Sequence, residues 1–344
     1  RARVRGKTVI ASLKTFDNLS YWWMTSIAVK SPFENDSLYT IFKLRALERL
    51  YLEQNCSGLV YCGNDHALHQ TLQDWCRKQG HPYKRFRTAK KRAPKETGIR
   101  NWLRKFPYWF QALVYLIKNW YLRYRHIDSI RPDEARQLQN ESGATLVTYF
   151  PNFDQEKAKK GEFFSRYWDG LNPTLNQLPF KTYWIWYYFE SPAFQFKEAV
   201  PLRDLCNQTR PEQRRYFLLE EFLTPGVFLK AIKLYLKIYG TGLRLKEAQK
   251  AFHLPGSTIN FFPLMEKEWK ASLFGNLAID GAIKIVVFDF MAKILPANPW
   301  GLFTWENLPL DFALMSAWRR HRKETRVLAS QHGFFRTFDL RLYS

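Results

Sequence analysis

The sequence is poor in cysteine and in acidic residues, and each shortage argues against a class of protein. Four cysteines occur among 344 residues, with no CxxC pair and no dense spacing. This disfavours a disulfide framework and a zinc site, and it favours buried thiols in a reducing compartment. Asp and Glu total 31 against 53 Lys and Arg, which gives a net charge of +22. Such a surface attracts anions, whether nucleic acid, an anionic membrane face, or a phosphorylated or acidic substrate.

Long apolar runs and the common nucleotide and metal motifs are missing as well. No stretch approaches the ~20 apolar residues of a membrane-spanning helix, so we expect a protein that is not integral to a membrane. The chain opens with RARVRGK, which contains neither an initiator Met nor an apolar signal core. It contains no Walker motif, GxGxxG, HExxH or GxSxG, so we expect no metal and no other cofactor.

The sequence does contain a regular alternation of strand-like and helix-like segments. Apolar runs rich in β-branched and aromatic residues occur at 8–13, 58–62, 145–150, 182–189, 301–305 and 326–330. Most are separated by segments with helical spacing, for example 311–322. This alternation is typical of a parallel sheet with crossover helices, so we predict an α/β fold with a Rossmann-like parallel sheet.

One part of the chain departs from this alternation. Residues 211–256 have apolar residues at helical spacing, interrupted by Pro225 and Gly226, and we predict a helical insertion there. The α/β domain then has a first part at 1–210 and a second part at 257–344.

Residues 84–125 form the most basic segment, with 13 Lys or Arg and a single acid. Wound as a helix, the second half has an apolar, aromatic arc opposite a basic face. The residues that we predict to face a membrane are Arg100, Arg104, Trp109, Lys118 and Trp120. Core packing of the aromatic arc with a solvated basic face remains an alternative to docking on anionic lipid. Nucleic acid is disfavoured, because base stacking requires aromatic and basic residues on one face.

Polar residues that directly follow the predicted strands are the candidate site residues, because ligands of parallel sheets bind beyond the carboxyl ends of the strands. Glu306 and Asn307 follow one strand, and Gln331 and His332 follow another. A carboxylate and an imidazole at neighbouring strand ends can act as general base and proton donor. Glu306 as a helix N-terminal carboxylate and His332 as an ordinary hydrogen-bonded histidine remain alternatives. Asp154, after an earlier strand, is also consistent with a turn or cap residue.

Short motifs over most of the chain share their pattern with one protein family. They are Tyr21-Trp22-Trp23, Lys30-Ser31-Pro32, Ser165-Arg166-Tyr167-Trp168, Trp305-Glu306-Asn307, Ala317-Trp318-Arg319, Gln331-His332-Gly333 and the segment 336–343. Together they resemble bacterial surface-carbohydrate biosynthesis proteins. The chain departs from the family pattern at Leu308, Phe338 and Leu342, where Gln, Trp and an aromatic residue are expected, so it resembles a divergent member.

The resemblance implies a glycosyltransferase of surface polysaccharide assembly with a GT-B fold. More loosely, the chain is similar to retaining transferases of Kdo, an acidic eight-carbon sugar, from its CMP-activated form. In such a protein the first Rossmann-like domain holds the acceptor and the second binds the sugar nucleotide. This chain ends near the expected start of the second domain, so we expect the donor-binding half to be missing.

Under this interpretation Glu306 is the candidate base or nucleophile, and His332 protonates or hydrogen-bonds the leaving or attacking oxygen. Retention of configuration would favour a second carboxylate, for which Asp154 is the candidate. The predicted substrate-binding residues are Asn307, Gln331, Arg336 and Arg341. Both guanidinium groups could hold a sugar carboxylate or phosphate through paired hydrogen bonds.

We expect a cytoplasmic protein, peripheral at the inner face of the cytoplasmic membrane. Its expected partners are a sugar nucleotide donor, a glycan or glycolipid acceptor and an anionic membrane surface, without nucleic acid. Two other functions remain open. The first is a non-catalytic binding protein of the same polysaccharide machinery, and the second is a nucleic-acid-binding protein.

Overall fold

The fold comes from a computed structural model of the chain. It describes residues 3–4, 6–16, 19–31, 35–88, 103, 105–150, 153–190, 194–209, 212–297 and 299–331. These residues divide into two compact units of discontinuous sequence. Unit 1 comprises the residues up to Leu113 together with Leu236–Ala278, and unit 2 comprises Val114–Tyr235 and the residues from Ile279 onward.

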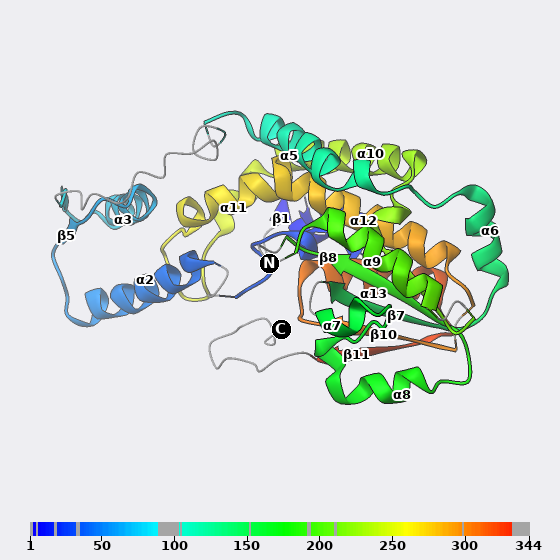
Figure 1. Ribbon diagram of the computed structural model, residues 1–344. Coiled ribbons are helices and arrows are strands. Elements are labelled where there is room, and N and C mark those ends of the chain that lie inside the picture. Colours follow the sequence, from blue (N-terminus) through cyan, green and yellow to red (C-terminus); the bar gives the residue numbers. More distant parts are fainter. Residues whose placement is uncertain are drawn as a thin grey trace. The chain divides into compact units, whose positions relative to one another are not determined.

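Unit 2 is built on a five-stranded sheet in which all strands are parallel. The strands are β7 (Ala144–Phe150), β8 (Thr182–Tyr188), β9 (Arg214–Leu218), β10 (Trp300–Trp305) and β11 (Arg326–Gln331). Their order is β11-β10-β7-β8-β9, so the chain builds outward from β7 on one side and then on the other. Figure 1 labels β11, β10, β7 and β8 among these strands. This is the strand order of a Rossmann-type sheet, with the reversal between β7 and β10. The predicted α/β class with a parallel sheet is confirmed.

One face of this sheet is packed with aromatic side chains. All of β7 and nearly all of β8 are buried, as expected for central parallel strands covered on both faces. Phe150 stacks on Trp186 of the neighbouring strand with the ring centroids 4.7 Å apart. The elements that cover this face are α7 (Gln155–Ala158), η3 (Arg166–Leu171), α8 (Asn172–Asn176) and α9 (Phe196–Thr209).

Helices α12 (Asn276–Ile294) and α13 (Pro309–His321) pack on the other face. A glycine in β10 determines how closely α13 approaches. A Cβ atom built on Gly301 would lie 2.4 Å from the ring of Trp318, which is buried in α13. Any larger residue at position 301 would therefore push α13 away from the sheet.

Three further helices are α5 (Tyr108–Leu122), α6 (Pro132–Asn140) and α10 (Pro225–Arg244), with the short turns η2 (Tyr124–His126) and η4 (Leu219–Phe222). The sequence boundaries of the two units fall within α5, α10 and α12.

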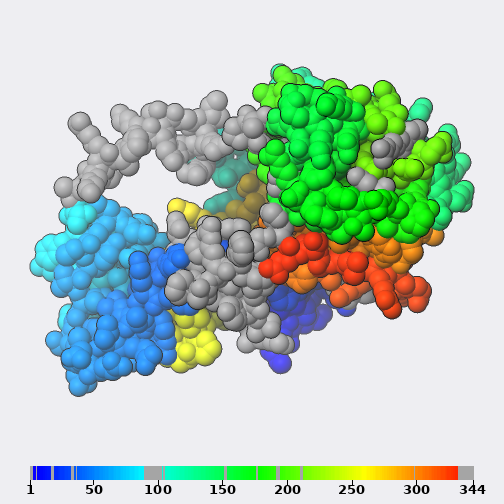
Figure 2. Space-filling view, turned by 60° about the horizontal axis from the view of Figure 1, so that its bottom comes forward, coloured from blue at the N-terminus to red at the C-terminus, as the bar shows by residue number. Residues whose placement is uncertain are grey.

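The two edges of the sheet differ. At the β9 edge, the Asn207 side chain accepts a hydrogen bond from the Tyr216 N–H at 2.7 Å and donates one to the Tyr216 carbonyl at 3.0 Å. The carboxylate of Glu221 accepts from the Leu218 N–H at 2.7 Å and pairs with Arg203 at 2.6 Å. Side chains thus cover this edge. The other edge strand, β11, is mostly exposed and contributes to the red surface in Figure 2.

The described part of unit 1 has two-stranded sheets. The antiparallel pairs are β1 (Arg3–Val4) with β2 (Lys7–Thr8) and β3 (Lys14–Phe16) with β4 (Leu19–Ser20). The parallel pair is β5 (Leu59–Cys62) with β6 (Tyr83–Phe86), joined by α3 (His66–Gln79). The core lies between α2 (Asp36–Glu53), α3 and α11 (Phe262–Phe274), around Leu44, Trp75 and Ile259. The remaining elements are α1 (Val9–Ser12), η1 (Tyr21–Met24) and η5 (Lys246–Ala251).

Four of the predicted strands, 145–150, 182–189, 301–305 and 326–330, and the predicted helix at 311–322 are confirmed. Residues 8–13 are not a strand of the main sheet. They end β2 and form α1, whose first turn is capped by the Thr8 hydroxyl accepting from the Ala11 N–H at 3.1 Å. Residues 58–62 do contain a strand, but it pairs with β6 outside the main sheet.

The prediction that 211–256 is wholly helical is wrong for Arg214–Leu218, which is the edge strand β9. Short apolar runs fit a buried strand and a buried helix equally well, because a few residues do not define a period. The rest of this segment contains η4, α10 and η5, as a helical prediction requires. The three-part division at 210 and 256 stays a prediction.

Among the described residues, no single helix has both the length and the apolar composition to cross a membrane. Taken as a pair, α11 and α12 meet both criteria, with a bend of 46° at the break between them.

Candidate active site at the carboxyl edge of the sheet

The turn between β10 and α13 lies where the strand order reverses. Glu306 and Asn307 directly follow β10, so they lie beyond the carboxyl end of that strand, as predicted. Asn307 has a φ of 55°, a left-handed conformation that Asn tolerates better than most residues with a side chain. The chain turns sharply here and enters α13 at Pro309.

Asp311 holds this turn in place. Its carboxylate accepts hydrogen bonds from the N–H groups of Glu306 at 3.1 Å and Leu308 at 3.0 Å, and the Asn307 N–H bonds to it as well. Burial raises the pKa of Asp311 to about 6, and the nearby charge of Glu306 acts in the same direction, although the amide hydrogen bonds oppose the shift. Backbone amides near a helix start commonly bind phosphate, but here the amides of the turn that leads into α13 already bind a carboxylate of the protein.

A cavity of about 10 Å³ beside this turn is lined by residues of β7, β8, β10 and α13, and its volume admits at most about one water. Tyr149 lines it, and the buried hydroxyl of Tyr149 has no hydrogen-bond partner among the described residues. Burial raises the pKa of Tyr149 far above its usual value, and the charges of Asp311 and Glu306 add to this effect. The hydroxyl therefore stays protonated and can donate a hydrogen bond to a group that reaches it.

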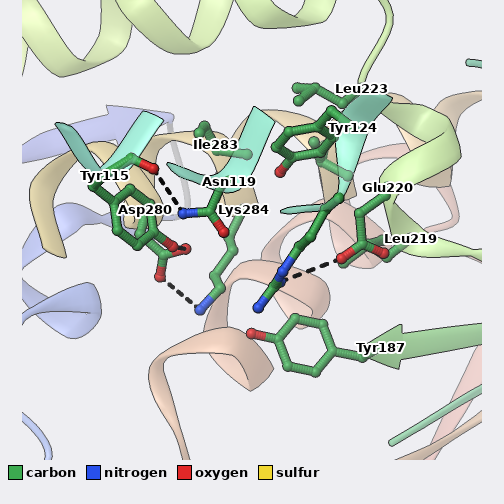
Figure 3. Close-up of a pocket in the computed structure, with 12 residues that line it drawn as sticks. Tyr115, Asn119, Tyr124, Tyr187, Leu219, Glu220, Leu223, Asp280, Ile283 and Lys284 are labelled. Carbon is green, nitrogen blue, oxygen red and sulfur yellow. Dashed lines mark hydrogen bonds and ion pairs between the residues drawn. The ribbon is translucent and has the colours of Figure 1, made fainter. Parts of the chain in front are cut away.

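Tyr187 of β8 connects this corner of the sheet to a second one. Its ring meets the ring of Tyr149 edge-on, with centroids 5.7 Å apart and an angle of 81° between the planes. The ammonium of Lys284 lies 5.4 Å from the centroid of the Tyr187 ring and is hydrogen-bonded to its hydroxyl. Figure 3 shows this hydroxyl pointing toward Lys284. Tyr187 lines the cavities of both corners.

The second corner contains a charge cluster, formed by Arg123, Glu220, Asp280 and Lys284 around a cavity of about 30 Å³ (Figure 3). Lys284 pairs with Asp280 at 2.7 Å, and Arg123 pairs with Glu220 at 3.4 Å. Tyr115 donates its hydroxyl to Asp280 at 2.6 Å. The side chains range from 7% exposed for Glu220 to 26% for Asp280. The cavity has room for one or two waters.

The ion pairs favour the charged forms of the two cations in the cluster despite burial. Burial opposes the positive charge of Lys284, but Asp280 and Tyr187 outweigh it and raise the pKa of Lys284 well above its usual value. The pKa of Arg123 is raised in the same way by Glu220. Burial raises the pKa of Glu220, and Arg123 offsets part of that rise. One oxygen of Glu220 lacks a hydrogen-bond partner in the described part of the chain, so it can accept one from a bound group.

Asp154 has a local structural role. It is the N-cap of α7, and its carboxylate accepts from the N–H groups of Glu156 at 3.0 Å and Lys157 at 3.1 Å. The hydrogen bond from Lys157 is the main reason that its pKa is lowered. This is the cap interpretation that the sequence left open. A catalytic role for Asp154 stays a prediction. Its carboxylate already accepts hydrogen bonds from two backbone amides.

The structure places some of the other predicted residues. Gln331 ends β11 and is in register with Trp305 of β10, so Gln331 and Glu306 lie at adjacent strand ends. The predicted site residues outside the described part of the chain are Arg100, Arg104, His332, Arg336 and Arg341.

Helix α5 turns part of its apolar arc outward. Trp109 is 52% exposed and Trp120 is 60% exposed, so the alternative in which these side chains pack into the core is wrong. Lys118 is exposed as well and pairs with Glu190 at 3.0 Å. Contact between α5 and a membrane stays a prediction.

The charge cluster is not among the site residues predicted from the sequence. Asp280 and Lys284 lie one helical turn apart in the otherwise apolar run 277–288. Charged residues are rarely buried unless they are paired, so an acid and a lysine at this spacing in an apolar helix would have indicated a buried pair. Arg123 gave no such signal, because it lies in the segment 84–125, where Lys and Arg are frequent.

No group of three or more His, Cys, Asp or Glu in the described ranges could hold a metal ion. No protein-family model matches the chain, and no curated protein or solved structure matches it either.

Proposed function

We propose that the protein is a glycosyltransferase of bacterial surface polysaccharide assembly, with its active site at the carboxyl edge of the sheet in unit 2. The position of Glu306 carries this proposal. It follows β10 where the strand order reverses, which is the usual ligand position in such sheets. The resemblance of Trp305-Glu306-Asn307 and the other motifs to surface-carbohydrate biosynthesis proteins supports sugar transfer as the reaction.

Glu306 accepts the proton of the attacking acceptor hydroxyl in this proposal, as a general base. Asp311 acts as a positioning residue, because its hydrogen bonds to the Glu306 and Leu308 amides hold the backbone from which the Glu306 side chain projects. The unpartnered hydroxyl of Tyr149 supports a role as donor to a substrate oxygen. His332 is the proposed proton donor to the leaving oxygen.

The donor phosphate requires cationic or amide partners. The amides of the turn before α13 are taken by Asp311, and the first amides of α7 by Asp154, so we place the phosphate at neither position. Arg336 and Arg341 are the proposed partners of a phosphate or sugar carboxylate, with Asn307 and Gln331 as further substrate contacts. A GT-B architecture, a CMP-activated acidic sugar such as Kdo and a glycan or glycolipid acceptor belong to the same proposal. So does a cytoplasmic position at the membrane, which the net charge of +22 supports.

The proposal is tested by nucleotide release. The full-length protein, which in a GT-B architecture carries the donor-binding domain as well, is incubated with CMP-Kdo, UDP-glucose or GDP-mannose, with and without membrane glycolipid, and the free nucleotide is quantified by chromatography. We expect release from one donor and a loss of at least ~100-fold in Glu306→Gln, the low end of a general-base contribution. Gln keeps the shape of the side chain, so folding should be preserved. Glu324→Gln is the control, because it removes an exposed carboxylate between α13 and β11 and should leave release unchanged.

Normal release by the Gln variant would make Glu306 a structural residue of the turn and refute its role as base. If no donor released nucleotide while the protein bound purified polysaccharide, the non-catalytic alternative would replace the proposal.

A further inference from the structure

Helix α10 is cationic and lacks acidic residues. Its 20 residues include Lys230, Lys233, Lys237 and Arg244 and no Asp or Glu. A surface helix of a soluble domain commonly mixes charges of both signs, which stabilise each other one turn apart. The cations of α10 have no acidic partner on their own helix.

The two sides of α10 (yellow-green in Figure 1) differ in burial. On the inner side, Val227, Ala231 and Ile238 are at most 3% exposed, and they anchor the helix. On the outer side three leucines project, with exposed fractions of 61% for Leu229, 61% for Leu236 and 50% for Leu243. They are seven residues apart, and a helix drifts by only ~20° over that interval, so they form one stripe along its outer surface.

The cations form a band beside this stripe. At about 100° per residue, Lys233 lies roughly 40° from Leu229, and Lys230 and Arg244 lie on the same side of the stripe. Lys230, Lys233 and Arg244 are all exposed. We propose that this docking face of α10, the leucine stripe with its adjacent cationic band, binds an anionic lipid surface. The leucines enter the boundary between headgroups and acyl chains, and the cations contact the headgroup phosphates.

Charge favours a lipid surface over a second copy of the chain. Leucines at every seventh position also occur in paired helices, but α10 has no acid to face the cationic band of a partner α10. Pairing two such faces would bring lysine against lysine, whereas an anionic bilayer attracts every cation of the band.

Helix α5, the helix that the sequence favours, also exposes apolar side chains such as Trp109 and Trp120, but α10 offers more cations to an anionic lipid surface. The exposed Lys118 of α5 already pairs with Glu190, whereas the cationic band of α10 faces outward beside three exposed leucines. This inference deepens the membrane location proposed above. It is tested without any sugar substrate, so its failure and that of the proposed reaction are distinguishable.

The test is co-sedimentation of the full chain with phosphatidylcholine vesicles that contain or lack phosphatidylglycerol. We expect binding to the anionic vesicles, and weaker binding at 1 M salt, where the screening length is about 3 Å. The leucine variant is Leu229→Ser/Leu236→Ser/Leu243→Ser, and the charge variant is Lys230→Gln/Lys233→Gln/Arg244→Gln. Each should bind anionic vesicles at least about tenfold more weakly, because binding depends on buried apolar area and on attraction to anionic lipid.

The control variants replace exposed leucines or exposed cations at positions outside α10. Leu50→Ser/Leu52→Ser removes leucines that are 56% and 61% exposed on α2. Lys43→Gln/Arg49→Gln/Lys78→Gln lowers the net charge by the same amount as the charge variant. Both controls should bind like the wild type, and circular dichroism should show that every variant is folded.

Three outcomes would overturn the inference. The α10 variants could bind like the wild type. The charge control could lose as much binding as the charge variant, which would show that net charge alone is responsible. Light scattering could show a dimer that the leucine variant loses while its vesicle binding is unchanged, which would assign the face to self-association.

Discussion

The two corners of the sheet's carboxyl edge are built in opposite ways. At the β10–α13 turn, backbone amides are organised by the buried carboxylate of Asp311, and the bonded groups are at most five positions apart in the sequence. At the ends of β8 and β9, the charge cluster pairs side chains that come from the residue after α5, from η4 and from α12. The first corner is therefore local and follows from a strand and the helix after it. The second exists only once distant segments have packed together.

Breaking an ion pair in the charge cluster should have the largest effect. Lys284→Met leaves the carboxylate of Asp280 without its cation at a largely buried site. We expect a loss of about 3 kcal/mol in the free energy of unfolding, the low end for removing one partner of a buried pair. Urea denaturation followed by tryptophan fluorescence measures this loss. Asp280→Asn/Lys284→Met should recover much of it, because the unpaired charge is gone.

Lys270→Met is the matched control for this substitution. Lys270 pairs with Glu266 at the same spacing and the same 2.7 Å distance as Lys284 with Asp280, but both side chains of the control pair are more than two-fifths exposed. Lys270→Met should lower the free energy of unfolding by less than about 0.5 kcal/mol. Equal losses for both variants would mean that the charge cluster is no more desolvated than the surface pair.

The raised pKa of Asp311 should make the free energy of unfolding depend on pH. The pKa of Asp311 is about 6 in the folded protein against 3.8 for an ordinary Asp, so the folded state holds the proton more tightly. Its contribution to the free energy of unfolding therefore falls by about 2 kcal/mol as the pH rises from about 4 to about 6. Asp311→Asn should remove this slope. Denaturation curves at several pH values, compared between wild type and variant, would contradict the assignment if the two profiles ran parallel.

Substitutions of Asn307 should change the free energy of unfolding least. They also distinguish backbone strain from contact with substrate. Asn307→Ala places a less tolerant residue at a φ of 55° and should lower the free energy of unfolding by about 1 kcal/mol. Asn307→Gly should be close to neutral, because glycine adopts this conformation freely. If the Asn307 amide binds substrate, the Gly variant should raise KM in the nucleotide-release assay at unchanged stability. An unchanged KM would leave Asn307 with a backbone role alone.

The strands that the sequence predicted correctly are those with strong local signals. β7, β8, β10 and β11 are predominantly apolar runs that end at polar residues, and that pattern also located Glu306. β9 was missed because its apolar part is too short to define a period, and because the two arginines that begin it are not typical of a buried strand. Arg214 is 5% exposed and Arg215 is paired with Glu134, so tertiary partners make this polar sequence compatible with an edge strand.

The same limit applies to the site. Asp154 and Asp311 are both acids near the start of a helix, and sequence alone cannot show whether such an acid reaches substrate or bonds the local amides. In the structure both carboxylates bond the amides. The charge cluster required long-range packing, since Arg123 and Lys284 are far apart in the sequence, and the exposed leucines of α10 could be recognised only once the buried side of the helix was known.

The side-chain cover of β9 has a consequence for polymerisation. An incoming polypeptide that added a strand at this edge would have to displace Asn207 from the Tyr216 backbone and Glu221 from the Leu218 amide. The Glu221 carboxylate, which also pairs with Arg203, would then lack the hydrogen bond from the Leu218 amide. This end of the sheet is therefore a poor template for cross-β growth and for donor-strand exchange between molecules.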